Sequence, residues 1–216
     1  MSEFSTPAQA GIVGLLLAAG KGSRFDASGR ESKLLAALPD GTPVALASAR
    51  RLLQCCARVL AVLPQHAAPP RDQHVLQLVG LLAEAGCEIV FCADSDAGLG
   101  HSLAAGVRAA PHAAGWLVAL ADMPAIEVST LRAVAAACTQ PRHIAAPIYR
   151  ARRGHPVVFG SAYYAGLAAL QGDQGARGVL LDHASAVTEV PCDDAGVLRD
   201  IDTPADLENL PHRDRA

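Results

Sequence analysis

The sequence predicts a single-domain α/β protein, a three-layer α/β/α Rossmann-like fold in which helices cover both faces of a mostly parallel sheet. Short apolar runs of strand length alternate with segments of helical periodicity along most of the chain. A length of 216 residues is enough for one domain with a sizeable core. Apolar residues make up 51% of the chain, and its abundant alanine favours close packing of helices on a sheet.

The first predicted strand covers residues 12–17, an almost wholly apolar run that ends at small residues and glycines. Similar runs predict strands at 58–63, 88–92, 116–120, 144–149 and 186–190. Helical periodicity predicts helices at 44–56, 71–85, 103–110, 128–138 and 178–184, and Thr203-Pro204 is typical of the start of a further helix. In the 71–85 helix, Leu76, Val79 and Leu82 are expected on the apolar face. We expect residues 1–10 to be a flexible lead and residues 11–210 to form the domain.

Composition argues against several classes of protein. The formal net charge is −3, whereas a nucleic-acid binder would usually show a basic excess. Residues 1–10 lack the basic and apolar regions of a signal peptide, and the apolar run at 11–19 is too short to cross a membrane. The six cysteines form no CxxC pair, so we expect no zinc site, and because no export signal is evident we expect reduced thiols. These observations predict a cytoplasmic protein without nucleic-acid or membrane partners.

The loop after the first strand reads A-A-G-K-G-S-R from Ala18 to Arg24. Glycines allow close backbone approach, and runs of free N–H groups can cradle phosphate oxygens. Lys21, Arg24 and Lys33 add positive charge around the same loop, so the pattern indicates a phosphate cradle. It is neither a P-loop, because Leu15 occupies the position of the first glycine, nor a dinucleotide fingerprint, because Phe25 occupies that of the third. The alternative is a glycine-rich turn with solvated basic residues.

Two further segments follow predicted strands. Asp122 comes two residues after the end of the 116–120 strand, where a carboxylate can hold Mg²⁺ together with substrate phosphates; the alternative is a helix cap. The loop 94–102, with Gly98, Gly100, His101 and Ser102, leads into a helix whose free N–H groups suit an anion. Here the alternative is an ordinary helix start with Ser102 as the N-cap.

Basic and acidic residues gather in three later segments. Arg150, Arg152 and Arg153 precede His155 in a turn that could also be a solvated hairpin tip. The loop 170–177 combines Asp173, Gly175 and Arg177 before a helix, a pattern that suits phosphate recognition or a turn with an ion pair. Near the end of the chain, Asp200 and Asp202 precede Thr203-Pro204.

L-A-A-G-K-G-S-R followed by Lys33 resembles the opening of nucleotidyltransferases of the nucleotide-diphospho-sugar transferase fold, and most of all the molybdenum cofactor nucleotidyltransferases. The segments G-L-G-H-S-L-A-A-G-V, L-A-D-M-P, G-H-P-V-V-F, G-D-x-G-A-R and D-I-D-T-P-A-D-L resemble those of the family in the same order. The spacer Phe25–Ser32 is longer than usual. The resemblance covers nearly the whole chain and implies a nucleotidyltransferase domain at 11–210.

The resemblance implies roles for individual residues. Catalysis falls on Arg24, Lys33 and Asp122, and the metal ligands are Asp122 and Asp202, with Asp200 as the alternative to Asp202. The cofactor would be Mg²⁺, with Mn²⁺ as the alternative ion. Nucleotide binding falls on Leu17, Ala18, Ala19, Gly20, Lys21, Gly22, Ser23, Arg24, Lys33, Ser102 and Asp122. Acceptor binding falls on His101, Ser102, His155, Asp173, Gly175 and Arg177.

The implied reaction transfers CMP from CTP to the phosphate of molybdenum-bound molybdopterin and releases pyrophosphate, which gives the cytosine dinucleotide cofactor. Ala18-Ala19 resembles the cytidylyl branch of the family, and a dianionic phosphate monoester needs no base to activate it. Transient contact with an apo-molybdoenzyme or its maturation chaperone would follow. The alternatives are GTP as donor, a sugar or polyol phosphate as acceptor, and a non-catalytic chaperone that binds molybdopterin.

Overall fold

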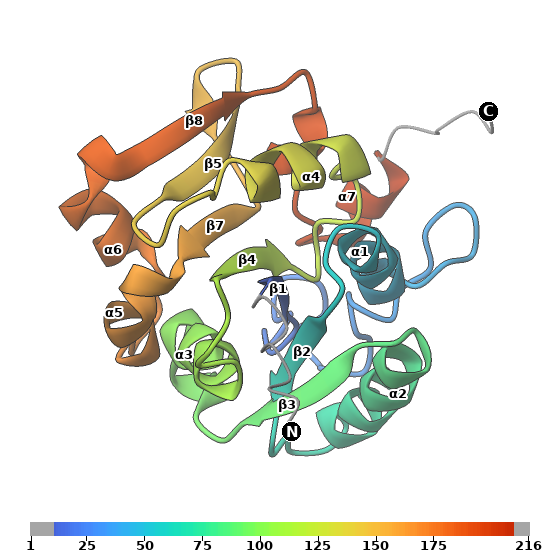
Figure 1. Cartoon of the computed structure of the whole chain (residues 1–216). Helices are drawn as coiled ribbons and strands as arrows, with labels where there is room; N and C mark the ends of the chain where they lie inside the picture. The colour runs from blue at the N-terminus through green and yellow to red at the C-terminus, as the bar shows by residue number, and fades with distance from the viewer. Residues whose placement is uncertain (1–10, 210–216) are drawn as a thin grey trace, which may run out of the picture.

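The computed structural model describes residues 11–209, so the predicted flexible lead at 1–10 lies outside the described residues. One eight-stranded sheet forms the centre, with the order β3-β2-β1-β4-β7-β5-β6 and β8 beside β5. Helices and strands alternate along the chain (Figure 1). Their bounds are β1 Ile12–Leu17, α1 Val44–Leu53, β2 Val59–Pro64, α2 Arg71–Glu84, β3 Glu88–Cys92, α3 Leu99–Ala109, β4 Gly115–Leu120, α4 Val128–Ala136, β5 Ile144–Tyr149, β6 Arg152–Arg153, β7 Val157–Gly160, α5 Tyr164–Ala168, α6 Arg177–Asp182, β8 Val187–Pro191 and α7 Pro204–Glu208.

The sheet is mostly parallel, as predicted. Strands β3, β2, β1 and β4 run parallel, with Leu16 opposite Ala61 on one side and Ala119 on the other. Strand β7 pairs antiparallel with both β4 and β5, while β8 pairs parallel with β5. The strand β7, which no segment of the predicted set covered, therefore joins the two parallel groups into one sheet.

Two apolar cores lie on opposite faces of the sheet and give three layers. Successive side chains of a strand point to opposite faces, so Leu16 joins one core and Leu15 and Leu17 join the other. Helices α1, α2 and α4 cover the first face, and α3 and α5 cover the second (Figure 1). The indole of Trp116 is fully buried on the α3 side, where its Nε1 donates to the carbonyl of Ala110 at 3.2 Å.

Two details of the predicted helices are wrong. Leu76 is 72% exposed, whereas Leu78 and Leu82 are buried. The spacing 76, 79, 82 has a period of three and drifts around a helix of 3.6 residues per turn, so Leu76 leaves the buried face. Helix α3 begins at Leu99, four residues before its predicted start, because its first turn packs against the loop at 171–172.

All six cysteines are free thiols. Burial raises the pKa of Cys56 to about 12 and that of Cys87 to about 11, so both thiols are protonated and unreactive near neutral pH. Within residues 11–209, no helix combines the length and apolar character needed to cross a bilayer.

Candidate active site at the carboxyl ends of the strands

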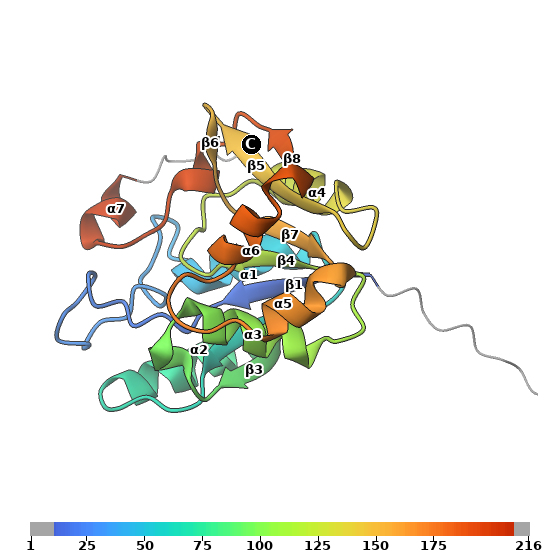
Figure 2. The ribbon, with the colours of Figure 1, turned by 90° about the vertical axis from the view of Figure 1, so that its left-hand side faces the viewer.

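The predicted site residues lie where the parallel strands end. The glycine loop follows β1, Asp122 follows β4, and Asp202 precedes α7. Figure 2 shows the loop after β1 and helix α7 at the same end of the molecule. Ligand sites of open α/β sheets lie at this end because the loops that follow neighbouring parallel strands meet there.

The backbone of the glycine loop is available to a ligand. In the described part of the chain, the N–H groups of residues 19–24 donate to no protein acceptor. Gly22 has a φ of +65°, and its carbonyl accepts from the N–H groups of Phe25 and Asp26, which turns the chain after the loop. A Cβ added at Gly20 would meet no protein atom within 4 Å, so the space beside it is open. Consecutive unpaired N–H groups beside open space suit phosphate oxygens.

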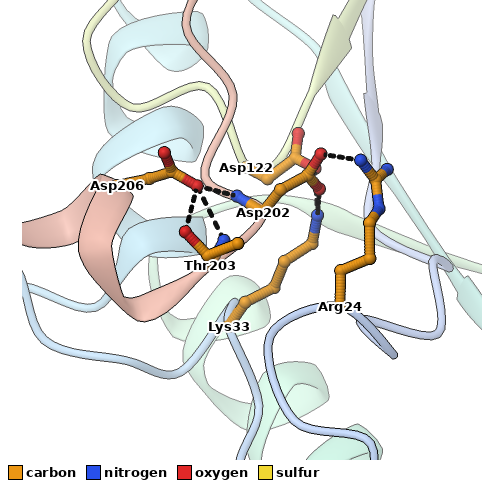
Figure 3. Close-up of polar contacts among 6 residues, drawn as sticks. All are labelled: Arg24, Lys33, Asp122, Asp202, Thr203 and Asp206. Carbon is orange, nitrogen blue, oxygen red and sulfur yellow. Dashed lines mark hydrogen bonds and ion pairs between the residues drawn. The ribbon is translucent and has the colours of Figure 1, made fainter.

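Lys33 bridges two carboxylates that come from distant parts of the chain (Figure 3). Its Nζ donates to Asp122 Oδ2 at 2.6 Å and to Asp202 Oδ1 at 3.0 Å, and all three side chains are less than 20% exposed. Arg24 Nη1 lies 2.5 Å from Asp202 Oδ2 but is 76% exposed. Burial acts to lower the pKa of Lys33, yet the two carboxylates outweigh it, so the pKa is raised and Lys33 stays charged. The long spacer thus still brings Lys33 to Asp122.

Hydrogen bonds fix the backbone around both carboxylates. The hydroxyl of Ser48 donates to the carbonyl of Ala121 at 2.9 Å, and the N–H of Ile201 donates to the carbonyl of Asp122 at 2.9 Å. The carboxylate of Asp206 accepts from the N–H groups of Asp202 and Thr203 and from the Thr203 hydroxyl (Figure 3). The capping box of α7 therefore orients Asp202 as well as starting the helix.

Asp122 and Asp202 have the chemistry of a magnesium site. Asp122 does not cap α4, which begins at Val128 after Glu127, so the helix-cap alternative is wrong. Its Oδ1 is buried without a hydrogen-bond partner, which leaves one oxygen available to a cation. No group of three or more acidic, histidine or cysteine side chains suited to a metal occurs within residues 11–209, so a cation here would need oxygens from a bound substrate as well.

Asp200 lies close to the same pair. Burial, followed by the negative charges of Asp202 and Asp122, raises the pKa of its carboxyl group. Within the described part of the chain, Asp202 contacts Lys33 and Arg24, whereas Asp200 makes no ion pair with either. The metal roles of all three aspartates stay predictions.

A largely apolar cavity of about 230 Å³ opens between β4, β7, α3 and α6. Three of the predicted acceptor residues line it, namely His155, Gly175 and Arg177, together with Arg153. Burial lowers the pKa of His155, although nearby Asp122 acts in the opposite direction, and its Nδ1 is buried without a hydrogen-bond partner. His155 is therefore uncharged near neutral pH. The apolar lining was not found from the sequence and consists of Leu17, Leu99, Leu103, Val118, Leu120, Val157, Phe159, Ala176 and Leu180.

The predicted loops before α3 and α6 hold each other. The N–H of Gly100 donates to the carbonyl of Gly172 at 2.8 Å, and His101 Nδ1 accepts from the N–H of Gly172 at 3.3 Å. A Cβ at Gly98 or Gly100 would lie 2.4 to 2.7 Å from backbone atoms of the 171–172 segment, so only glycine permits this approach. The G-L-G spacing therefore serves the contact between the two loops.

The remaining predicted ligand residues differ in exposure and in pairing. Ser102 lies inside α3, where it is 2% exposed, so the alternative that it caps the helix is wrong. Its predicted contact with a substrate stays a prediction. Asp173 and Arg177 are both exposed and, among the described side chains, do not pair with each other. Lys21 Nζ lies 3.6 Å from Asp96 Oδ1.

Fold and site together define the chain as a nucleotidyltransferase of the α/β class. More specifically, residues 14–187 match the MobA-like NTP transferase domain, and the chain belongs to this family. A nucleotidyl transferase from Methanothermobacter is similar in fold, with a TM-score of 0.73 at 23% identity over 90% of this chain and 93% of that one. The predicted family and the nucleotide-diphospho-sugar transferase fold are thereby confirmed.

Other relatives carry different names. Nicotine blue oxidoreductase of Paenarthrobacter nicotinovorans is 31% identical over 210 residues, which are 92% of this chain and 96% of that protein. Purine catabolism protein PucB of Bacillus subtilis is 36% identical over 122 residues, which are 54% of this chain and 58% of PucB. Rv0371c of Mycobacterium tuberculosis, solved in complex with manganese, is 26% identical with a TM-score of 0.70 over 93% of this chain and all of that one.

Proposed function

We propose that the protein transfers CMP from CTP to the phosphate of molybdenum-bound molybdopterin, which forms molybdopterin cytosine dinucleotide and releases pyrophosphate. One observation carries this proposal. The Lys33–Asp122–Asp202 cluster lies beside the unpaired N–H groups of residues 19–24. Cationic and carboxylate groups next to a phosphate cradle are what nucleotidyl transfer requires, and a protein that only binds the pterin has no need of both.

In the proposed reaction, a phosphate oxygen of the acceptor attacks the α-phosphorus of the nucleotide. The bond between the α-phosphorus and its oxygen bridge to the β-phosphate breaks, and the pyrophosphate carries away the electron pair. The acceptor phosphate is mostly dianionic at neutral pH, so no general base is needed. The obstacle is charge repulsion, which the loop N–H groups, Arg24 and Lys33 would reduce around the triphosphate.

A divalent cation fits this site. Asp122, through its unpartnered Oδ1, and Asp202 would hold Mg²⁺, with Mn²⁺ as the alternative ion, and the manganese complex of the 26% identical Rv0371c supports divalent metal use. When bound, such an ion supplies Lewis-acid stabilisation of the phosphate charges. Lys33 Nζ now occupies the space between the two carboxylates, so it would turn from them toward the triphosphate.

The acceptor would enter the cavity beside His155. Its apolar walls suit a flat ring system, while Arg153 and Arg177 offer positive charge for a phosphate. Because His155 is uncharged, we propose that it contacts the acceptor through a hydrogen bond rather than an ion pair. Ala18-Ala19 favours cytosine over guanine by resemblance. A cytoplasmic location and transient contact with an apo-molybdoenzyme or its maturation chaperone belong to the same proposal.

An oxidoreductase is the second candidate. The observation in its favour is the similarity to nicotine blue oxidoreductase, which extends over nearly the whole length of that protein. The apolar cavity would also accept a flat aromatic substrate. To test this candidate, the oxidation of a reduced nicotinamide cofactor by an aromatic electron acceptor is measured from the change in absorbance. The wild type and the Asp122→Asn variant are compared. An oxidoreductase that does not use the carboxylate pair would keep its activity in that variant.

The test of the first candidate is pyrophosphate release with Mg²⁺ and molybdenum-loaded molybdopterin, comparing CTP with GTP. Release with CTP that is lost in Asp122→Asn supports the proposal. A preference for GTP would leave the mechanism unchanged but show that the proposed base, cytosine, is wrong. Release with a sugar or polyol phosphate in place of the pterin would show that the proposed acceptor is wrong. No release from folded protein that still binds the pterin would favour the chaperone over the enzyme.

A further inference from the structure

A smaller pocket lies between the glycine loop and α2. Its walls include the backbone of Gly20 and Gly22 and the side chains of Lys21 and Lys33, all parts of the predicted nucleotide cradle. Arg71 and His74 from the first turn of α2 complete it. The loop after β1 and the start of α2 lie at the same end of the molecule in Figure 2. The sequence patterns assign neither α2 residue a role.

The pocket is suited to a compact anion. It has a volume of about 30 Å³ and is partly open to solvent. Lys21 and Arg71 bring two positive charges to its wall and Glu31 one negative charge, whereas the Lys33 ammonium is paired with Asp122 and Asp202. Because it shares Gly20, Gly22 and Lys33 with the cradle, a phosphate in this pocket could belong to the same nucleotide whose α-phosphate lies near Asp122.

Asp96 holds two of these cations loosely. Its Oδ1 lies 3.6 Å from Lys21 Nζ and 3.6 Å from Arg71 Nη1, beyond ordinary hydrogen-bond distance. The Asp96 side chain is 55% exposed, and exposed ion pairs of this kind contribute little free energy. One carboxylate shared by two cations at this distance can be exchanged for a more highly charged anion.

Arg71 also contacts the long spacer between Arg24 and Lys33. Its Cγ lies 3.6 Å from the position of a Cβ at Gly29, whose φ is +69°, so the arginine stem packs against the backbone there. The same spacer is folded around Asp26, which accepts from the N–H groups of Ser28 and Glu31. Arg71 therefore reaches the pocket from a position that the spacer holds.

We propose that Arg71, together with Lys21, binds the terminal phosphate of the nucleotide and then the pyrophosphate product, and that Asp96 occupies both cations while the pocket is empty. The inference rests on the proposed nucleotidyl transfer for its ligand. It extends the cradle from the loop after β1 to α2, and it gives the long spacer a function as the support of Arg71. In this proposal Arg71 recognises the terminal phosphate of the nucleotide and not its base.

The test is calorimetric titration of the full chain with inorganic pyrophosphate in the presence of Mg²⁺. Arg71→Met removes the charge but keeps a stem that can pack on Gly29, and we expect about tenfold weaker binding from the loss of one partly exposed charge-assisted hydrogen bond. Asp96→Asn frees both cations and should tighten binding several-fold. Arg58→Met makes the same change in net charge at an arginine that pairs with Glu88 at the other end of β2, and should change binding less than twofold.

The expected changes in pyrophosphate affinity are opposite for Arg71→Met and Asp96→Asn, and this difference distinguishes a binding role of Arg71 from a structural one. If Arg71 served only to hold Asp96 and its loop, Asp96→Asn would weaken pyrophosphate binding as Arg71→Met does, and this result would overturn the inference. So would an Arg71→Met variant that binds pyrophosphate like Arg58→Met. If no nucleotide is turned over but pyrophosphate binding still depends on Arg71, the proposed function is wrong and the assignment of the pocket as a phosphate site is retained. If CTP is turned over but Arg71→Met binds pyrophosphate as the wild type does, the pocket fails and the proposed function stands.

Discussion

Replacing Lys33 by methionine should make the free protein a better metal binder. Lys33 Nζ is 2.6 Å from Asp122 and 3.0 Å from Asp202, so a divalent ion held by both carboxylates must first displace it. Each charge-assisted hydrogen bond contributes about 1.5–3 kcal/mol at most, and partial exposure lowers that value. Since the Lys33 side chain is 12% exposed, we take about 1.5–3 kcal/mol for both bonds together, which corresponds to about 10- to 100-fold in affinity.

The assay is titration with Mn²⁺ in the absence of nucleotide, in which the paramagnetic resonance signal of free Mn²⁺ reports the unbound ion. Arg24→Met should have a smaller effect of a few-fold, because Arg24 contacts only Asp202 and is 76% exposed. Arg58→Met, which removes an equal charge at the other end of β2, should leave Mn²⁺ binding unchanged. Mn²⁺ affinity in Lys33→Met equal to or weaker than that of the wild type would refute the reasoning.

Three other predictions follow from the site. Asp122→Asn should lower the rate of nucleotidyl transfer at least ~10³-fold while circular dichroism stays unchanged, because it removes the carboxylate charge without changing its size. In His155→Gln the free energy of unfolding should fall less between pH 7 and 5.5. Because the pKa of His155 is lowered in the folded protein, below about pH 6.5 only the unfolded wild type binds a proton at this imidazole. The free energy of unfolding therefore falls by up to ~1.4 kcal/mol per pH unit, and the glutamine variant lacks this loss. Gly154→Ala should destabilise the fold by about 2 kcal/mol or more in urea unfolding, since its Cβ would lie 2.2 Å from the Val197 carbonyl oxygen. Gly178→Ala, in helix α6 with open space around it, should be neutral or stabilise the fold by up to about 1 kcal/mol.

Sequence patterns predicted the parallel part of the fold well. The apolar runs that became β1 and β4 are buried on both faces and alternate with helices, so their length and composition determine their structure. The antiparallel strand β7 was missed, because Val157–Gly160 is short and its pairing with β4 depends on contacts between distant segments. Leu76 was wrongly placed, because a spacing of three resembles a helical face over only two turns.

Local motifs located the site without giving its contacts. Asp122 was predicted because it comes just past an apolar strand, whereas Asp202 was predicted from the resemblance of D-I-D-T-P-A-D-L to the family. The bridge between them could not be predicted, since Lys33 is separated from Asp122 by 89 residues and from Asp202 by 169. Arg71 carries no pattern of its own, and only the fold brings it to the glycine loop.

In the proposed function, the α-phosphate of a nucleotide is transferred to a phosphorylated pterin. The most direct measurement uses CTP labelled at its α-phosphate, incubated with Mg²⁺, molybdenum-loaded molybdopterin and the full chain. We expect the label to appear in a pterin dinucleotide, with one pyrophosphate released for each label transferred and no transfer by Asp122→Asn. Label that stays in CTP, in protein shown to bind both CTP and the pterin, would contradict the claim.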